Sequence, residues 1–233
     1  MTRLRARTAA ALAATTLALG GCGITPFGSD DTTTAAAPDP GRQLTDREAE
    51  QALPEVPVGA EAAPVQPEAQ DLETSPSQCL DVLRGGQQGD ELKATEVVHA
   101  RRVWSADQPA GSQYTVSIGS HSEPIGSQVL DTAGAAMSTC ATFTFSGRDA
   151  TGTFETTMQS QPRTVAPVGD QTFAARITIV EVIGGQERKI FIDQLVVRVG
   201  HNLLRVNHSH WDESSGHEPL EAQVRAMLDD LAQ

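Results

Sequence analysis

Apolar residues recur at two different spacings along the C-terminal part of the chain. Between Pro124 and Cys140 they fall three or four positions apart, the period that places side chains on one side of a helix. The members of this stripe are Ile125, Val129, Ala133, Ala136, Met137 and Cys140. The same spacing returns at the end of the chain in Leu220, Val224, Met227, Leu228 and Leu231. The pattern therefore predicts two amphipathic helices.

Segments rich in β-branched and aromatic residues, bounded by Gly, Pro or Asp, predict strands. Three of them, 171–183, 188–199 and 203–210, are joined by tight turns and predict an antiparallel meander. Shorter candidates upstream are "ELKATEVVHARRVWSA", "GSQYTVSIGSH" and "TGTFETTMQSQ". Strands interspersed with helices indicate an α+β fold, in which helices pack on a largely antiparallel sheet.

The segment 22–77 is rich in Ala, Pro, Thr, Asp and Glu and predicts a disordered tether before a folded domain at 78–233. One island interrupts it. Thr45 and Glu48 have the spacing of a capping box, and Leu44 is placed to contact Ala49, so a short helix over 46–53 is predicted. Whether this helix docks on the domain is left open by the sequence.

Residues 1–21 have the features of an export signal. Three arginines within the first seven residues precede the apolar stretch Thr8–Leu19, which is shorter than the ~20 residues that span a bilayer. The stretch from Leu19 to Cys22, "LGGC", resembles the bacterial lipobox, and this resemblance implies that Cys22 is lipidated. We therefore expect an acyl anchor at Cys22 on the outer face of the cell membrane. The alternative is a plain secretory signal with an incidental cysteine.

The charge balance restricts the partners. The chain has 17 Lys+Arg against 30 Asp+Glu, a formal net charge of -13. Nucleic acids and anionic lipid head groups require basic surfaces, so neither is an expected direct partner. Attachment to the membrane is expected through acyl chains instead.

Cys79 and Cys140 are the two cysteines that remain once Cys22 is assigned to lipid. Export brings the chain into an oxidising compartment, where an even number of cysteines is most simply explained by a disulfide. The sequence thus predicts the pair Cys79–Cys140, with two buried free thiols as the alternative.

The order of these segments resembles a known family. The strand "SQYTVSIGSHSE", the helix ending "AAMSTCATF", the strand pair "DQLVVRVGHNLLRVNHSH" and the closing amphipathic helix are similar to the extracellular sensor domain of mycobacterial PknH-type receptor kinases and related actinobacterial lipoproteins. The family tends to have a tryptophan where this chain has Met137, and the kinase sensor has a second disulfide that the cysteine count forbids here. The resemblance implies an antiparallel sheet flanked by helices, with a cleft for a small or envelope-derived ligand.

Aromatic and histidine side chains near strand ends are the candidate ligand-binding residues, because they offer stacking area and hydrogen-bond donors. They are Trp104, Tyr114, His208, His210 and Trp211. In the last predicted strand, Leu204, Val206, His208 and His210 share one face. Ordinary packing or surface positions are the alternative interpretation of all five candidates.

Catalytic and metal chemistry have weaker support. His208 and His210, with His217, Asp212 or Glu213, could supply zinc ligands, but no spacing fixes their convergence. No HExxH motif, nucleophile elbow or Gly-rich phosphate loop is present. We therefore expect no catalysis, no cofactor and no bound metal. Two functions remain: a tethered sensor-like domain that binds an unknown small envelope ligand, or an adaptor that docks on an envelope protein.

Overall fold

In the computed structural model, the described residues, from 38 to Gln233, all belong to one compact unit. The described residues are 38–65, 70–85, 89–106, 111–150, 152–183 and 186–233. The predicted signal peptide and the predicted lipidation site Cys22 lie outside them. Within the described residues, no helix has the length and apolar character needed to cross a bilayer.

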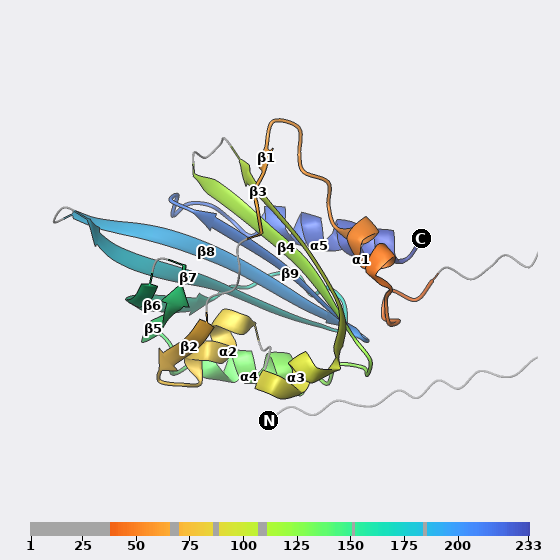
Figure 1. Cartoon of the computed structure of the whole chain (residues 1–233), viewed down its shortest axis with the longest axis horizontal. Helices are drawn as coiled ribbons and strands as arrows, with labels where there is room; N and C mark the ends of the chain where they lie inside the picture. Colours follow the sequence, from red (N-terminus) through yellow and green to blue (C-terminus); the bar gives the residue numbers. More distant parts are fainter. Residues whose placement is uncertain (1–37, 66–69, 86–88, 107–110, 151, 184–185) are drawn as a thin grey trace, which may run out of the picture. The chain divides into compact units, whose positions relative to one another are not determined.

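Nine strands of the described residues form one sheet, in which every neighbouring pair is antiparallel (Figure 1). The order across the sheet is β1-β3-β4-β9-β8-β7-β6-β5-β2. The strands are β1 (Glu61–Ala62), β2 (Gln70–Ser75), β3 (Glu96–Ala106), β4 (Ser112–His121), β5 (Thr142–Asp149), β6 (Gly152–Pro162), β7 (Gln171–Ile183), β8 (Gln186–Val199) and β9 (Asn202–His210). The predicted meander β7-β8-β9 is therefore confirmed, and it forms the centre of the sheet.

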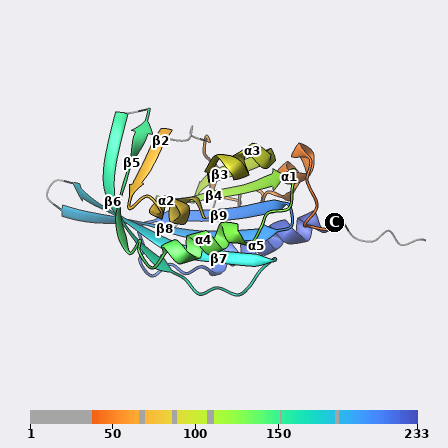
Figure 2. The same ribbon diagram turned by 90° about the horizontal axis from the view of Figure 1, so that it is seen from below.

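Helices cover both faces of the sheet. They are α1 (Asp46–Ala52), α2 (Cys79–Arg84), α3 (Gly89–Thr95), α4 (Gln128–Ala136) and α5 (Glu218–Leu231). Figure 2 shows α2, α3 and α4 in front of the sheet and α5 behind it. We call the first side the α2 face and the second the α5 face. The α+β fold with helices flanking a largely antiparallel sheet is thus confirmed.

Each face has its own apolar core. On the α5 face, Leu220, Val224 and Met227 of α5 pack against alternate residues of the central strands, such as Leu204 and Val206. On the α2 face, the buried residues of α4 pack with β7 and with α2. The disulfide Cys79–Cys140 lies fully buried in this second core and joins the start of α2 to the segment after α4. The predicted pairing is confirmed.

The described part of the segment predicted as a tether is folded. The capping box of Thr45 and Glu48 is formed at α1, and Leu44 and Ala49 are buried in the α5-face core. Upstream of α1, the Asn202 side-chain amide donates to the carbonyls of Pro40 and Arg42. The described contacts of the folded unit thus reach back to Pro40, upstream of the domain start expected at Gln78. Only a few side chains of this segment are buried, so its composition is mostly polar. That composition is why the sequence indicated a disordered tether.

The turn between β8 and β9 explains why this early segment is held so closely. Gly200 has a φ of +53°, and a Cβ on it would collide with the carbonyl of Gly41. The backbone N–H of His201 donates to that same carbonyl at 2.8 Å. Only glycine permits both the left-handed turn and this contact. The turn therefore docks the N-terminal segment on one end of the central strands.

Candidate functional site

A row of five side chains crosses the α5 face of the sheet, one from each of five adjacent strands. In order they are Trp104, Tyr114, His208, Asp193 and Arg176, on β3, β4, β9, β8 and β7. Each is the direct cross-strand partner of the next, which brings the side chains of such a pair within contact distance. We call this set the polar row. It brings together three of the sequence-predicted candidates and adds two residues that the sequence analysis did not single out.

A buried ion pair forms one end of the polar row. The guanidinium of Arg176 donates to both carboxylate oxygens of Asp193, each at 2.7 Å. Asp193 is 0 % exposed, and Arg176 is also buried. A charge removed from water in this way is tolerated only when it is paired and hydrogen-bonded. Each of the two charges can therefore remain buried only because the other is present.

Two histidines surround the same carboxylate. His210 Nε2 lies 2.9 Å from Asp193 Oδ2, and His217 Nε2 lies 3.6 Å from Oδ1. Burial by itself would raise the pKa of Asp193, but the hydrogen bonds from His210 and Arg176 outweigh burial and lower it to about 2. Burial also lowers the pKa of His217. The carboxylate is thus ionised at neutral pH and is the anionic centre of the cluster.

Arg176 also holds the loop between β9 and α5. Its guanidinium donates to the carbonyl of Glu213 at 2.6 Å and to that of Ser215 at 2.5 Å. The loop leads directly to His217 and the first turn of α5. The ion pair therefore positions the helix that covers this face, in addition to filling the interior.

His208 lies between two other rings. Its ring centroid is 4.1 Å from that of Tyr114 and 4.5 Å from that of His210. It is 2 % exposed, and Ser112 Oγ lies 2.5 Å from its Nε2. Burial lowers the pKa of His208 to about 4, with a further contribution from nearby His210. His208 is therefore neutral at pH 7 and supports Tyr114 from within the core.

The cluster does not suit a metal ion as it is arranged. One ligand atom each from Asp193, His208 and His210 lies within 4.8 Å of the others. However, both oxygens of Asp193 accept from Arg176, and His208 Nε2 is engaged by Ser112. Asp212, which the sequence analysis considered as a ligand, accepts instead from Ser214 in the exposed loop. The Asp193 carboxylate is thus committed to its ion pair, whereas His208 Nδ1 and His210 Nδ1 are buried without a hydrogen-bond partner among the described residues.

The pair of Ser112 and His208 does not form a catalytic triad with Asp193. The carboxylate is hydrogen-bonded to His210, and His208 contacts His210 by ring stacking. Ser112 is buried, so its hydroxyl cannot be approached by a substrate without rearrangement. The arrangement resembles a structural polar network more closely than a nucleophile with its base.

A pocket of about 340 Å³ opens at the other end of the polar row. Tyr114 and Trp104 form one wall, with ring centroids 5.5 Å apart and stacked planes. The loop 57–60 and Gln223 of α5 complete the lining. Gln223 Oε1 is buried and has no hydrogen-bond partner among the described residues. The pocket thus combines an apolar aromatic wall with a polar residue whose acceptor is unused, a pattern typical of small-molecule sites.

The five predicted ligand residues occupy different environments. Trp104, Tyr114, His208 and His210 form one continuous stack on the α5 face, but both histidines are buried behind Tyr114. Trp211 is 47 % exposed and lies outside this stack. Its ring covers Gly111, where a Cβ would come within 2.7 Å of Trp211 Nε1. Four of the five predicted residues are therefore brought together.

Asp193 and Arg176 are the residues that the sequence analysis missed. Each stands in the apolar phase of its strand, two positions from the buried residues Leu195 and Ala174. The sequence signal that could have identified them is a single acidic and a single basic residue among the buried, alternate positions of two neighbouring strands. Their register, however, is visible only in the sheet.

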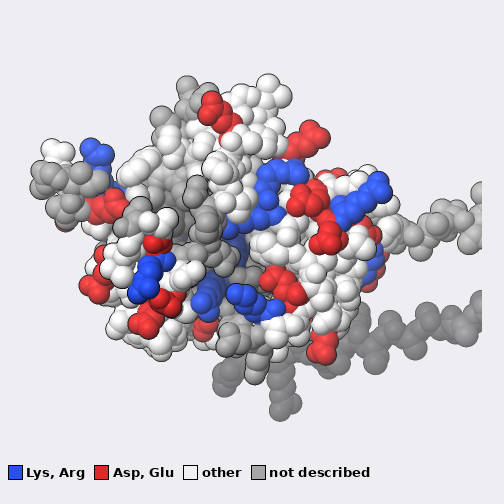
Figure 3. Space-filling model, viewed as in Figure 1, with Lys and Arg blue, Asp and Glu red and all other residues white. Residues whose placement is uncertain are grey.

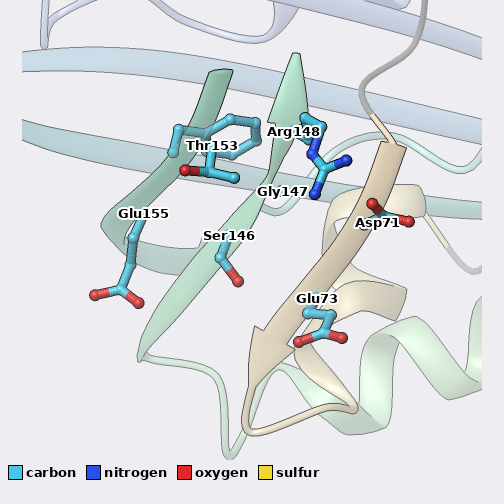
Figure 4. Close-up of a pocket in the computed structure, with 8 residues that line it drawn as sticks. Asp71, Glu73, Ser146, Gly147, Arg148, Thr153 and Glu155 are labelled. Atoms are coloured by element: carbon cyan, nitrogen blue, oxygen red, sulfur yellow. The ribbon is translucent and has the colours of Figure 1, made fainter.

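A second, more open pocket of about 440 Å³ lies on β2, β5 and β6 (Figure 4). Glu73, Ser146 and Glu155 are cross-strand neighbours there, and Figure 4 shows the two glutamates on opposite sides of Ser146. Arg148 and Asp71 lie toward the other end of the same pocket. The carboxylates do not converge on a common point, so the pocket lacks the geometry of a metal site.

Comparison with known proteins identifies the fold. No protein-family model matches the sequence, and a search of curated proteins found no match. Among solved structures, the extracellular domain of PknH from Mycobacterium tuberculosis matches with a TM-score of 0.57 and 9 % identity, over 82 % of this chain and 98 % of that one. A putative uncharacterized protein from Mycobacterium smegmatis gives a TM-score of 0.39 at 13 % identity, over 74 % and 81 %. The resemblance inferred from the sequence is thus confirmed for the fold: the chain has the architecture of the extracellular domain of PknH.

Proposed function

We propose that the chain is a lipoprotein anchored on the outer face of the cell membrane, whose folded unit binds a small envelope ligand without catalysis. The observation that carries this proposal is the pocket beside Tyr114, with its aromatic wall and the unpartnered Gln223 Oε1. The fold shared with the extracellular domain of PknH supports an extracytoplasmic setting. The burial of Ser112 and the internal use of Asp193 support a non-catalytic role.

The ligand that fits this pocket is flat or apolar and carries at least one hydrogen-bond donor. Because the two faces of the Tyr114 ring already stack on Trp104 and His208, the ligand body would pack against the edges of the aromatic rings, and a donor would satisfy Gln223 Oε1. Trp104 is 1 % exposed and extends the wall from behind. His208 and His210 act through Tyr114, because their rings are stacked beneath it and are buried.

The anchor has its own test. We expect the mature protein to begin at Cys22 and to fractionate with membranes, whereas the Cys22→Ser variant is released or misprocessed. The measurement is membrane fractionation together with mass spectrometry of the mature N-terminus. Normal processing and membrane retention of the variant would refute the lipid anchor.

The pocket is tested by a thermal-shift screen of peptidoglycan fragments and lipids, followed by calorimetric titration of each hit. Gln223→Leu fills the acceptor position with an apolar side chain and is expected to weaken binding about tenfold, the effect of one hydrogen bond in a buried site. Gln159→Leu is the matched control, because Gln159 is exposed on β6, away from the pocket. Equal affinities of the two variants would remove this pocket from the binding site.

The adaptor function has one observation in its favour. A groove of about 570 Å³ at the free ends of β5, β6 and β7 contains Phe145, Phe154, Met158 and Ile179, and acidic residues line its rim. Its charge suits an apolar segment of an envelope protein flanked by basic residues. Crosslinking in intact envelopes, with Phe154→Asp as the disrupted variant, tests this second candidate.

A further inference from the structure

The strands β6 and β7 separate before either of them ends. They pair with each other only over 158–162 of β6 and 175–179 of β7. β6 already begins at Gly152, and β7 continues to Ile183, where the two strands pair with β5 and β8 alone. Figures 1 and 2 both show the β7–β8 hairpin projecting away from β5 and β6. We call this place, between β6 before Met158 and β7 after Ile179, the fork.

Main-chain hydrogen-bonding groups of both strands point into the fork. In an antiparallel sheet, the N–H and C=O groups of successive residues point in turn to one neighbouring strand and to the other. Arg163, directly after β6, donates its N–H to the Ala174 carbonyl of β7. By this alternation, Glu155 and Thr157 of β6 and Val180 of β7 direct their main-chain groups into the fork. These three residues have no ladder partner on that side among the described residues, so they form the kind of open strand edge that an extended peptide can join.

An apolar groove follows the fork on the α2 face. Phe145, Phe154, Met158 and Ile179 line its volume of about 570 Å³. The ring centroids of Phe145 and Phe154 are 5.3 Å apart, and Met158 and Ile179 belong to the α2-face core or pack against it. Side chains of a strand point alternately to its two faces, so every second side chain of a strand added in the fork would lie on this groove.

The charge around the groove favours a basic partner. Glu155 and Glu181 line the groove and form no ion pair with any described residue, and none of its lining residues is Lys or Arg. Figure 3 shows Asp and Glu side chains at this end of the molecule, with Lys and Arg side chains at the projecting hairpin and farther in. Segment 23–37 of the chain has two aspartates and no Lys or Arg, and a second copy carries the same net charge of -13. Both are therefore disfavoured as occupants, compared with a segment that carries positive charge.

We propose that the fork binds an extended segment of a partner protein as an added β-strand, with apolar residues at alternate positions and Lys or Arg at its ends. The segment would lie between β6 and β7 and exchange main-chain hydrogen bonds with Glu155 and Thr157. Its apolar side chains would contact Phe154 and Ile179, and its basic ends would lie near the glutamates of the rim. This inference rests on the adaptor function, the second candidate, and is independent of the pocket beside Tyr114.

Three synthetic peptides test the binding mode by calorimetric titration of the protein at low ionic strength. The first is the acetylated and amidated peptide KTVTVTVTK, the second has Glu in place of both lysines, and the third is the first with N-methyl groups at every second residue. We expect the first peptide to bind and the other two to bind at least tenfold more weakly, because they lose the charge attraction and the main-chain hydrogen bonds, respectively. Equal binding of either control peptide, or no binding of the first, would overturn the proposal.

Amide hydrogen exchange measured by NMR locates the bound peptide. The N–H groups of Glu155 and Thr157 should exchange more slowly in the complex with the first peptide. The N–H groups of Phe154 and Thr156 point to β5 and should change little. Unchanged exchange at Glu155 and Thr157 with the peptide bound would contradict strand addition. The peptide and exchange measurements use the wild-type chain, so they do not depend on the folding of any variant.

Two substitutions examine the charge and the main chain separately. Glu155→Gln should weaken the first peptide about two- to fivefold, the effect of one exposed ion pair. Glu61→Gln is the matched control, because Glu61 is exposed on β1 at the opposite edge of the sheet. Thr157→Pro removes an N–H that points into the fork and should weaken the peptide about tenfold, whereas Thr157→Val keeps that N–H and should bind as the wild type does. Equal affinities within either pair of variants would contradict the proposed site.

Crosslinking in intact envelopes separates this inference from the adaptor function on which it rests. A partner that is lost from Phe154→Asp but retained by Thr157→Pro would leave the adaptor function in place and refute strand addition. If no partner is crosslinked while the first peptide binds as expected, the adaptor function is refuted and the fork remains a strand-binding site.

Discussion

The two faces of the sheet are covered in the same way but are held together by different chemistry. On the α2 face, a disulfide between Cys79 and Cys140 joins α2 to the segment after α4, inside an apolar core. On the α5 face, the loop before α5 is held by Arg176, whose charge is compensated by Asp193. The disulfide is covalent and does not depend on pH, whereas the Arg176–Asp193 pair depends on two buried charges and on their protonation.

This difference determines how the stability of each face responds to substitution and to reduction of the disulfide. Removing a disulfide chiefly gives the unfolded chain more freedom and leaves the apolar core intact. Removing one member of a buried ion pair leaves the other charge without water and without a partner. The α5 face is therefore expected to be the more sensitive to a single substitution, and the α2 face the more sensitive to reduction.

The largest effect is expected from Asp193→Ala. It leaves the guanidinium of Arg176 buried and uncompensated, and the expected loss is about 3–5 kcal/mol in the free energy of unfolding. Urea denaturation followed by circular dichroism measures it. The double variant Asp193→Leu with Arg176→Leu removes both charges and should be more stable than Asp193→Ala. If the double variant is the less stable of the two, the ion pair is not what limits the α5 face.

Removal of the disulfide should cost about 2–4 kcal/mol, because the bridge closes a loop with a sequence separation of 61 residues. The variant Cys79→Ala with Cys140→Ala avoids an unpaired thiol. The same denaturation measurement, with reduced wild type as the control, checks this value. A double variant as stable as the oxidised wild type would show that packing alone holds the α2 face.

The sequence predicted the covalent link but not the ionic one, and the reason is physical. Cysteines can be counted, and an exported chain with two of them left has few alternatives. The pairing of Arg176 with Asp193 follows from the register of β7 against β8, which is set by the whole sheet.

Elements with strong periodicity were predicted well. The stripe of α4, the closing helix α5 and the meander β7-β8-β9 were all identified from apolar spacing. The short elements α2, α3, β1 and β2 were not, because few of their positions alternate clearly. In the candidate site, clustering of Trp104, Tyr114, His208 and His210 was anticipated, but the burial of the two histidines was not. His208 and His210 lie at the end of the last strand, on the same face as the buried Leu204 and Val206.

Acidification should weaken the α5 face more than the α2 face. Burial lowers the pKa of His208 from 6.5 to about 4. Between about pH 6.5 and pH 4, this histidine therefore binds a proton in the unfolded chain but not in the folded chain. Stability therefore falls as the pH is lowered from about 6.5 to about 4, by about 3 kcal/mol for a shift of this size. Thermal or urea unfolding across this pH range measures the loss.

His208→Phe is the matched variant for this test, because a phenyl ring can stack on Tyr114 but does not titrate. We expect a flatter dependence of stability on pH in the variant. Burial also lowers the pKa values of His217 and His121, so a smaller slope of the same sign should remain. An unchanged slope in His208→Phe would assign the acid sensitivity to other groups.

The smallest effect concerns α1, the second helix of the α5 face. The Thr45 hydroxyl accepts from the Glu48 N–H, so Thr45→Ala should cost about 1 kcal/mol, whereas Thr45→Ser keeps the cap. Because Ala49 and Ala52 are buried in the same core as Leu220 of α5, we expect this loss to appear in global unfolding. Hydrogen exchange separates the two possibilities: if only amides in α1 exchange faster while the denaturation midpoint is unchanged, α1 opens on its own. In that case the α5 face would be held by α5 and the Arg176–Asp193 pair without help from the N-terminal segment.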